Sequence, residues 1–154
     1  MLSTGEIAPD FTLPDDAGTP VTLSALRPGK VVIFFYPKAS TPACTTEGLD
    51  FSARAGDFAK AGTAVLGISR DSIRRQCNFR ARNALTIPLL SDENGTVCQD
   101  WGVWQEKQLY GKRYMGIVRS TFLIDGAGRV AQVWSDLRVK GHADEVLAAA
   151  RALA

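Results

Sequence analysis

The sequence predicts an α/β fold in which a mixed central sheet is flanked by helices. A strand, a helix and a second strand follow one another between residues 31 and 68, which is the pattern of a parallel βαβ unit. Two later strands surround Gly126–Gly128 and predict an antiparallel hairpin. A shorter hairpin precedes both. The parallel and antiparallel halves together predict a mixed sheet with an N-terminal β-hairpin.

Composition limits the class of protein. The chain has 154 residues, of which 45% are hydrophobic, and this suits one domain that spans the whole chain. A net charge of +2 argues against nucleic-acid and membrane partners. One local basic cluster is interpreted as a solvated helix face: Arg74, Arg75, Arg80 and Arg82.

No segment approaches the roughly 18 consecutive apolar residues of a membrane span, and Met1–Asp10 does not resemble an export signal. The three cysteines have no paired spacing, which fits a reducing compartment better than a disulfide scaffold. We therefore expect a soluble, cytoplasmic protein.

The N-terminal hairpin is predicted between Phe11 and Leu26, with its turn at Asp15–Gly18. We expect it to cover an edge or a face of the sheet. After a break at Arg27–Gly29, the run Val31–Tyr36 is apolar throughout. Continuous apolarity is typical of a central strand that is buried on both faces.

A helix is predicted to follow the loop after this strand. Thr41 is expected to be its N-cap and Pro42 its first residue, where the missing N–H costs nothing. Cys44 then occupies the third helical position. Free backbone N–H groups and the helix dipole favour thiolate over thiol there. Further along the helix, one apolar stripe belongs to the core: Phe51, Ala55 and Phe58.

The strand predicted at Thr63–Ile68 completes the βαβ unit. Cys44 would then lie at the carboxyl end of the first strand, where open α/β sheets have their sites. The next helix is predicted over Ile73–Ala84, capped by Asp71 or Ser72.

The middle of the chain is less regular. A short strand at Leu89 and Leu90 is followed by a helical turn within Gly95–Trp101. The segment Val103–Gly116 is rich in Gln, Lys and Tyr, and we expect it to form a surface loop or irregular extension.

The C-terminal third alternates strand, strand and helix. Val118–Asp125 and Val130–Trp134 are the strands of the antiparallel hairpin, and Ala143–Leu153 has the composition of a helix. The complete order of elements is typical of a thioredoxin-like fold.

The run Pro37–Glu47, P-K-A-S-T-P-A-C-T-T-E, carries a family resemblance. It fits the peroxiredoxin pattern P-x-x-x-T-x-x-C, and its last three residues resemble the bacterioferritin comigratory protein group, also called peroxiredoxin Q. The likeness extends over nearly the whole chain through three further blocks: Ala8–Phe11, Leu89–Asp92 and Arg119–Asp125.

The resemblance implies a thiol peroxidase, without metal or organic cofactor, that reduces hydrogen peroxide and organic hydroperoxides. Cys44 is the implied nucleophile and becomes a sulfenic acid. The Thr41 hydroxyl and the Cys44 backbone N–H are implied to hold the peroxide. Pro37 and Pro42 would shape the pocket, and Arg119 would pair with the thiolate and the leaving oxygen. The implied reductant is thioredoxin or a related thiol, and the implied state is a monomer.

Magnitudes indicate that a cation is needed beside Cys44. A free cysteine is only about 3% thiolate at pH 7, and making it mostly thiolate requires about 3 to 4 kcal/mol. A helix N-terminus supplies up to about 2 kcal/mol. We expect Arg119 to supply the remainder. Glu47 is either a partner of Arg119 or merely an acid near the helix start, where the dipole favours it.

The resolving step is less well defined. Many relatives carry a second cysteine where this chain has Leu49; in others it lies at what resembles the position of Arg80, and Cys77 is one helical turn before that. We expect Cys77 to form a disulfide with Cys44, which requires Cα atoms within about 7 Å and local unwinding. A one-cysteine cycle recycled by an external thiol is the alternative. Cys98 is expected to pack in the core.

A different class of protein also stays open. Cys44 could be a small buried hydrophobe in a redox-inert thioredoxin-like binding or chaperone module. His142, the only histidine, is expected to have a structural role at a helix end. Scattered cysteines and one histidine offer no zinc spacing, and the absence of C-x-x-C argues against a disulfide exchanger of the thioredoxin type.

Overall fold

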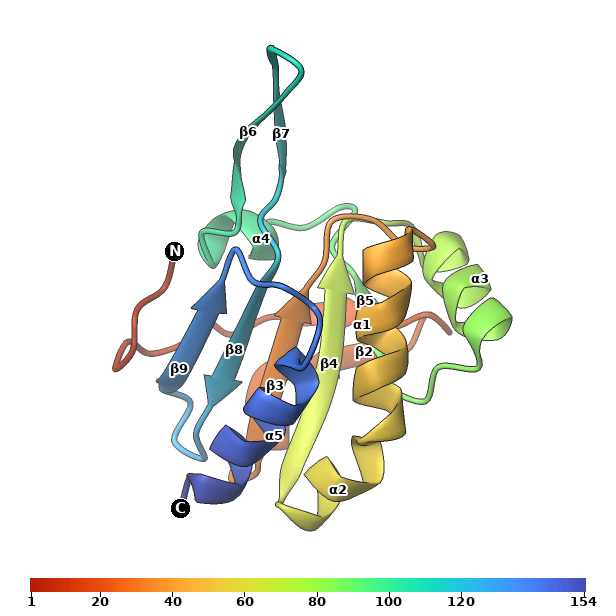
Figure 1. Ribbon diagram of the computed structural model, residues 1–154. Helices are drawn as coiled ribbons and strands as arrows, with labels where there is room; N and C mark the ends of the chain where they lie inside the picture. Colours follow the sequence, from red (N-terminus) through yellow and green to blue (C-terminus); the bar gives the residue numbers. More distant parts are fainter.

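A five-stranded sheet forms the centre of the computed structural model, which describes all residues 1–154 (Figure 1). Its strands are β3 (Lys30–Phe35), β4 (Thr63–Ser69), β5 (Leu89–Ser91), β8 (Ser120–Ile124) and β9 (Val130–Ser135). In space the order is β5-β4-β3-β8-β9, parallel from β5 to β3 and antiparallel from β3 to β9. The predicted mixed sheet is confirmed, with its βαβ unit and its later hairpin.

Successive residues of β3 contribute to two separate cores. Val31, Ile33 and Phe35 face one of them, whereas Val32 and Phe34 face the other. All five are at most 2% exposed. Because side chains alternate along a strand, burial on both faces requires an apolar residue at every position, as this run has.

Four helices cover one face of the sheet: α1 (Pro42–Ala53), α2 (Ala55–Lys60), α3 (Ile73–Asn83) and α5 (His142–Ala152) (Figure 1). Their inward side chains, among them Phe51, Phe58 and Phe79, share one core with Val32 and Phe34 of β3. The predicted helix that contains Cys44 is divided at Arg54, whose φ of −105° and ψ of 4° leave the helical region. The expected apolar stripe therefore runs over two helices.

The opposite face is covered by the N-terminal hairpin, β1 (Thr12–Pro14) and β2 (Pro20–Thr22), by the 3₁₀ helix η1 (Leu23–Leu26) and by α4 (Val97–Asp100). Trp101 lies in this core, where its ring contacts those of Phe11, Phe35 and Phe122. The prediction of an N-terminal hairpin is confirmed. None of the helices combines the length and the apolar character that a membrane span requires.

The prediction of an irregular Val103–Gly116 segment was wrong. β6 (Trp104–Leu109) and β7 (Lys112–Ile117) pair antiparallel and project from the body as a hairpin (Figure 1). Its turn residues Tyr110 and Gly111 have positive φ values of 50° and 77°, the geometry of a type I′ turn. Because most of the hairpin is exposed on both faces, it lacks the alternation of apolar and polar residues that identifies a half-buried strand.

Of the two caps considered for α3, Ser72 is the one used. Its side-chain oxygen accepts a hydrogen bond from the Arg75 backbone N–H at 3.2 Å. The helix ends where Ala84 adopts the left-handed conformation, with φ of 50°. Asp71 is left free for a different contact, in the site described next.

Candidate active site

The loop Pro37–Thr41 connects the carboxyl end of β3 to the start of α1 and is called the active-site loop below. A carboxylate just after β4 anchors the backbone of this loop. The Ala39 N–H donates to the buried Asp71 carboxylate at 2.8 Å, and the Ser69 hydroxyl donates to the same oxygen at 2.6 Å. The sequence offered Asp71 only as a helix cap, so this anchoring role was missed.

α1 begins as predicted. Pro42 is its first residue and Cys44 its third, while Thr41 takes the N-cap position with extended backbone angles. The Thr41 side chain makes no capping bond. Its hydroxyl instead donates to the Lys38 carbonyl oxygen at 2.7 Å, which leaves the Thr41 oxygen free to accept a hydrogen bond.

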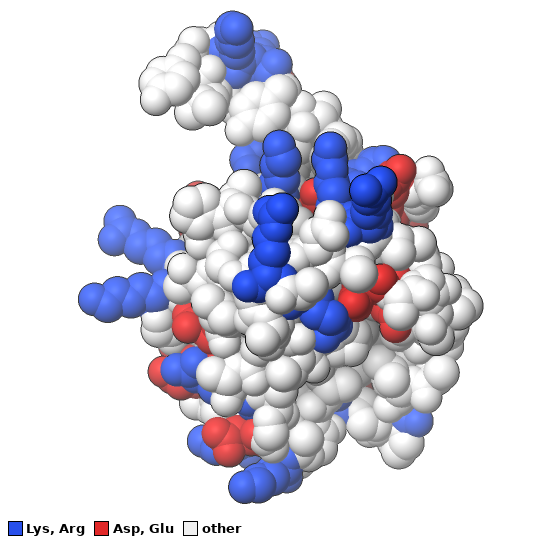
Figure 2. Space-filling model, turned by 90° about the vertical axis from the view of Figure 1, so that its right-hand side faces the viewer, with Lys and Arg blue, Asp and Glu red and all other residues white.

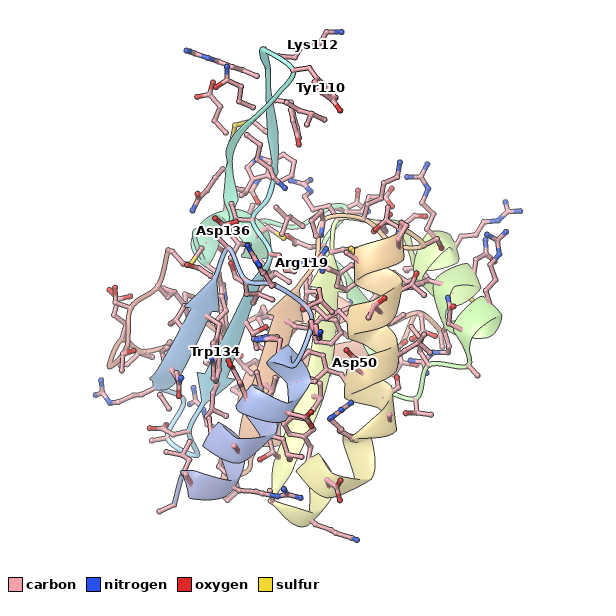
Figure 3. The ribbon with its side chains drawn as sticks, in the orientation of Figure 1. Asp50, Tyr110, Lys112, Arg119, Trp134 and Asp136 are labelled. Carbon is pink, nitrogen blue, oxygen red and sulfur yellow. The ribbon has the colours of Figure 1, made fainter.

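Arg119 reaches the start of α1 from the segment between β7 and β8 (Figure 3). Strand register explains its position, since Ser120 pairs with Phe35 and Arg119 is therefore level with the residue that follows β3. Its Nη2 lies 3.2 Å from the Sγ of Cys44. The thiol is 1% exposed, so a cation faces a buried sulfur at the N-terminal end of a helix.

Glu47 is the second partner of the Arg119 guanidinium. It lies three residues after Cys44, on the same side of α1, and its Oε1 accepts a hydrogen bond from Arg119 Nη1 at 2.6 Å. The side chain of Glu47 is 1% exposed and that of Arg119 is 14% exposed. Of the two roles considered for Glu47, the structure supports that of an Arg119 partner.

Burial governs the ionisation of this pair. It raises the pKa of Glu47 to about 7, although the guanidinium of Arg119 acts in the opposite direction. Oε2 of Glu47 is buried without a hydrogen-bond partner, which fits a carboxyl group that gains a proton easily. Burial disfavours the charge on Arg119, but Glu47 and Cys44 outweigh it and raise the pKa of Arg119, so the guanidinium remains cationic.

His142 lies apart from the sulfur. It is the first residue of α5, and its Nε2 is 2.8 Å from the Thr121 hydroxyl. Its ring packs against Phe51 and Trp134. Burial, with a smaller contribution from the charge of Arg119, lowers the pKa of His142 to about 4. This neutral, buried ring agrees with the expected structural role at a helix end.

The site residues predicted from the sequence are not all brought together. Cys44 contacts Arg119, and Pro37 and Thr41 lie in the loop that leads to Cys44. Cys77 is outside this cluster: it is exposed on α3, and all three cysteines are free thiols. The structure has no disulfide between Cys44 and Cys77.

Arg80, which the family resemblance suggested as the position of a resolving cysteine in some relatives, has a structural role. Its Nε lies 2.5 Å from an Asp16 oxygen, so it links α3 to the turn of the N-terminal hairpin. It also donates to the backbone carbonyls of Leu85 and Ile87. The interpretation of the α3 arginines as a solvated face is therefore wrong for Arg80.

Comparisons with known proteins identify relatives of this chain. The model of the AhpC/TSA family matches residues 4–133 of the chain. Peroxiredoxin Bcp of Xanthomonas campestris pv. campestris is 49% identical over 143 residues, which cover 93% of this chain and 89% of the relative.

Two solved structures are similar over most of their length. One is the bacterioferritin comigratory protein of Xanthomonas campestris, whose alkyl peroxide reduction activity was studied in trapped intermediate and ligand complexes. It has a TM-score of 0.88 and 48% identity, and the match covers 92% of this chain and 90% of that one. The other is a cysteine mutant of PrxQ from Xylella fastidiosa, with a TM-score of 0.93, 36% identity and coverage of 99% and 97%.

Proposed function

The chain belongs to the AhpC/TSA family and is a peroxiredoxin, an enzyme that reduces peroxides, and from this premise we propose that Cys44 is the residue that attacks the peroxide. One observation carries the proposal: the guanidinium of Arg119 lies 3.2 Å from the Cys44 sulfur. A buried cation beside a buried sulfur at a helix start favours the thiolate, which is the nucleophilic form. Membership in an enzyme family argues against a redox-inert binding or chaperone module.

The proposed reaction uses the contacts of this site. The Cys44 thiolate attacks one peroxide oxygen, an S–O bond forms and the O–O bond breaks. The second oxygen leaves as water from hydrogen peroxide, or as an alcohol from an organic hydroperoxide, after taking up a proton. Arg119 donates to the thiolate before attack and to the oxygen on which negative charge develops. The Thr41 hydroxyl, already donating to the Lys38 carbonyl, has its oxygen available to accept the peroxide O–H.

Substrates of this class include alkyl hydroperoxides. The similar bacterioferritin comigratory protein of Xanthomonas campestris has alkyl peroxide reduction activity, and its 48% identity supports the same chemistry here. Pro37 and Pro42 lie on either side of Thr41 in the chain and offer no backbone N–H of their own. We assign them the shaping of the peroxide pocket.

Glu47 is proposed as a positioning residue. Its 2.6 Å contact holds one end of the guanidinium, so that the other end points at the sulfur. A guanidinium that donates to two partners at once is less free to rotate away than one held by a single partner.

For the second half of the cycle we propose that Cys77 resolves the sulfenic acid. Its thiol attacks the oxidised sulfur of Cys44, water leaves, and a disulfide forms. Because Cys44 is buried in α1 and Cys77 is exposed on α3, the first turn of α1 must open before they meet. Thioredoxin or a related thiol then reduces the disulfide in the cytoplasm, and the whole chain acts as a single-domain monomer.

Intact-mass analysis after one equivalent of peroxide tests both halves. Wild type should lose two hydrogens, whereas Cys77→Ser should gain one oxygen and Cys98→Ser should behave as wild type. Gain of oxygen in both wild type and Cys77→Ser would support the one-cysteine cycle. Peptide mapping that placed the oxygen on a residue other than Cys44 would reject the assignment of the nucleophile.

A further inference from the structure

We propose that a basic surface beside the active-site loop is the docking site for an acidic protein thiol that recycles the enzyme. The basic surface is defined by five side chains: Lys38, Arg70, Arg75, Arg82 and Lys107. This inference rests on the proposed function, because it names where the reductant of that same cycle binds and which surface chemistry the reductant must have.

Two adjoining cavities give the basic surface its shape. The larger, of about 400 Å³, lies between the active-site loop and the β6–β7 hairpin and is lined by Pro37, Lys38 and Trp104, among others. The smaller, of about 260 Å³, lies between the same loop and α3. Both are lined by Lys38 and Arg75, so they form one continuous surface next to the loop that precedes Cys44.

The positive charges of this surface are not neutralised within the protein. No carboxylate oxygen lies within 4.0 Å of a side-chain nitrogen of any of its five members. Arg70 and Lys107 donate to backbone carbonyls instead. Asp71 is the one acid in the walls of both cavities, and it is buried and bonded to the active-site loop.

The arginines of α3 differ in a way that supports a binding role. Arg80 is paired with Asp16 and stabilises the fold, whereas Arg75 and Arg82 are exposed and turn toward the active-site loop side. Unpaired like charges held close together attract an oppositely charged partner and speed its association. Figure 2 shows Lys and Arg side chains gathered on this face, below the projecting hairpin.

The hairpin adds apolar contact area at the edge of the basic surface. Tyr114 and Met115 line the larger cavity and are 45% and 49% exposed. Tyr110, at the hairpin tip, is 95% exposed (Figure 3). Tyr, Met and Arg are enriched in protein–protein interfaces, where apolar anchors sit within a polar rim.

The extent of these features favours a protein over a small thiol. They reach from Arg82, near the end of α3, across the active-site loop to Tyr110 at the tip of the hairpin. A protein docked there has its thiols close to the segment that carries Cys44. In the recycling step two partner thiols are oxidised to a disulfide, while the enzyme disulfide is reduced to two thiols; in a one-cysteine cycle the sulfenic acid becomes thiol and water.

Charge reversal on α3 tests the proposal. The double variant Arg75→Glu/Arg82→Glu is compared with Arg74→Glu, a single charge reversal on the same helix that lines a different cavity beside β1. A bacterial thioredoxin is the protein thiol, and dithiothreitol is the uncharged one. The double variant should lose about tenfold or more in kcat/KM for thioredoxin, with a weaker salt dependence. Its turnover with dithiothreitol and the rate of its first reaction with peroxide should stay within twofold of wild type.

A second variant, Tyr114→Ala/Met115→Ala, changes no charge and should also lower kcat/KM for thioredoxin only. Equal losses with thioredoxin and dithiothreitol, or an unchanged kcat/KM for thioredoxin in the double arginine variant, would overturn the proposal. Glutathione, a small anionic thiol, is measured in the same way. A loss of kcat/KM confined to glutathione would also overturn the proposal, because it would assign the surface to a small anionic thiol. The peroxide step is measured separately, so failure of Cys44 to react would reject the proposed function and not the docking site.

Discussion

Cys44 and Cys98 are both buried in the first turn of a helix, yet their electrostatic surroundings are opposite. Cys44 is 1% exposed and Cys98 is fully buried. The sulfur of Cys44 accepts an N–H from Arg119 at 3.2 Å. Cys98 instead lies beside the Asp92 carboxylate, which accepts the Cys98 backbone N–H at 2.8 Å. Burial, followed by Asp92, raises the pKa of the Cys98 thiol well above its ordinary value.

We infer that a helix N-terminus is not sufficient to activate a sulfur. At α4, Asp92 takes the backbone N–H groups of Val97 and Cys98, so a negative charge already occupies the positive end of the helix. At α1 the N-cap side chain makes no capping bond and the nearest charge is a cation. We propose that the sign of the neighbouring charge distinguishes the reactive Cys44 from the inert Cys98.

The largest expected effect comes from exchanging each sulfur for oxygen. Cys44→Ser should abolish peroxide reduction, since an alcohol at this position is not ionised at neutral pH. Cys98→Ser should keep the wild-type rate constant, because Cys98 lies in a different core from Cys44. The measurement is peroxide consumption with dithiothreitol in excess. A tenfold loss in Cys98→Ser would mean that Cys98 also takes part in the reaction.

Removing the cation should bring the two cysteines closer in behaviour. Arg119→Ala is expected to lower the rate constant for peroxide by about 10²–10³-fold, because both the thiolate and the leaving oxygen lose a donor. Stopped-flow fluorescence gives the rate, and iodoacetamide labelling against pH gives the thiolate fraction. Arg129→Ala, an exposed arginine bound to the Gly5 carbonyl, serves as control. The rate constant of Arg119→Lys should lie between those of Arg119→Ala and Arg129→Ala. Lysine keeps the positive charge but cannot donate to Cys44 and Glu47 with the planar geometry of a guanidinium.

Local signals in the sequence were sufficient for one side of the site. The Thr41-Pro42 pair and the apolar run before it determine where the strand ends and the helix begins, so the place of Cys44 could be predicted. The contact with Arg119 depends on the register of β8 against β3. No local pattern contains a register between segments so far apart, and only the family resemblance supplied it.

The side of α3 that faces the core could not be predicted for a related reason. Buried Gln76 replaces an apolar residue there, because its amide bonds to the Tyr36 hydroxyl, the Ser69 hydroxyl and the Leu90 carbonyl. A hydrophobic pattern cannot identify a glutamine with buried partners. The exposure of Cys77, on another side of the same helix, followed only from the structure.

The pH dependence of stability should also distinguish the two cysteine sites, since Glu47 and His142 lie on the Cys44 side of the sheet. The pKa of Glu47 is about 7 in the folded protein against an ordinary 4.5. The folded state therefore binds this proton more tightly, and the free energy of unfolding falls by about 3 kcal/mol as pH rises from 4.5 to 7. His142 has the opposite shift, from 6.5 to about 4. Its contribution falls by about 3 kcal/mol as pH decreases from 6.5 to 4.

These two slopes largely cancel in wild type, so single variants should reveal them. In Glu47→Gln the free energy of unfolding should rise with pH between about 4 and 6.5, as His142 alone dictates. In His142→Asn it should fall with pH between about 4.5 and 7, as Glu47 dictates. Urea unfolding at half-unit pH intervals measures both. Parallel pH profiles in the two variants would contradict the assigned shifts.

The smallest expected effect lies at the inert cysteine. Asp92→Asn removes the negative charge beside Cys98 and weakens two charge-assisted hydrogen bonds at the start of α4, so the free energy of unfolding should fall by about 1 kcal/mol. Cys98 should still resist peroxide and iodoacetamide in the folded protein, because burial continues to disfavour the thiolate and no cation replaces Asp92. Urea unfolding and mass mapping of labelled peptides check the two outcomes. Labelling of Cys98 at a rate near that of Cys44 would mean that loss of a carboxylate is enough to activate a buried thiol, and the requirement for a cation such as Arg119 would then be disproved.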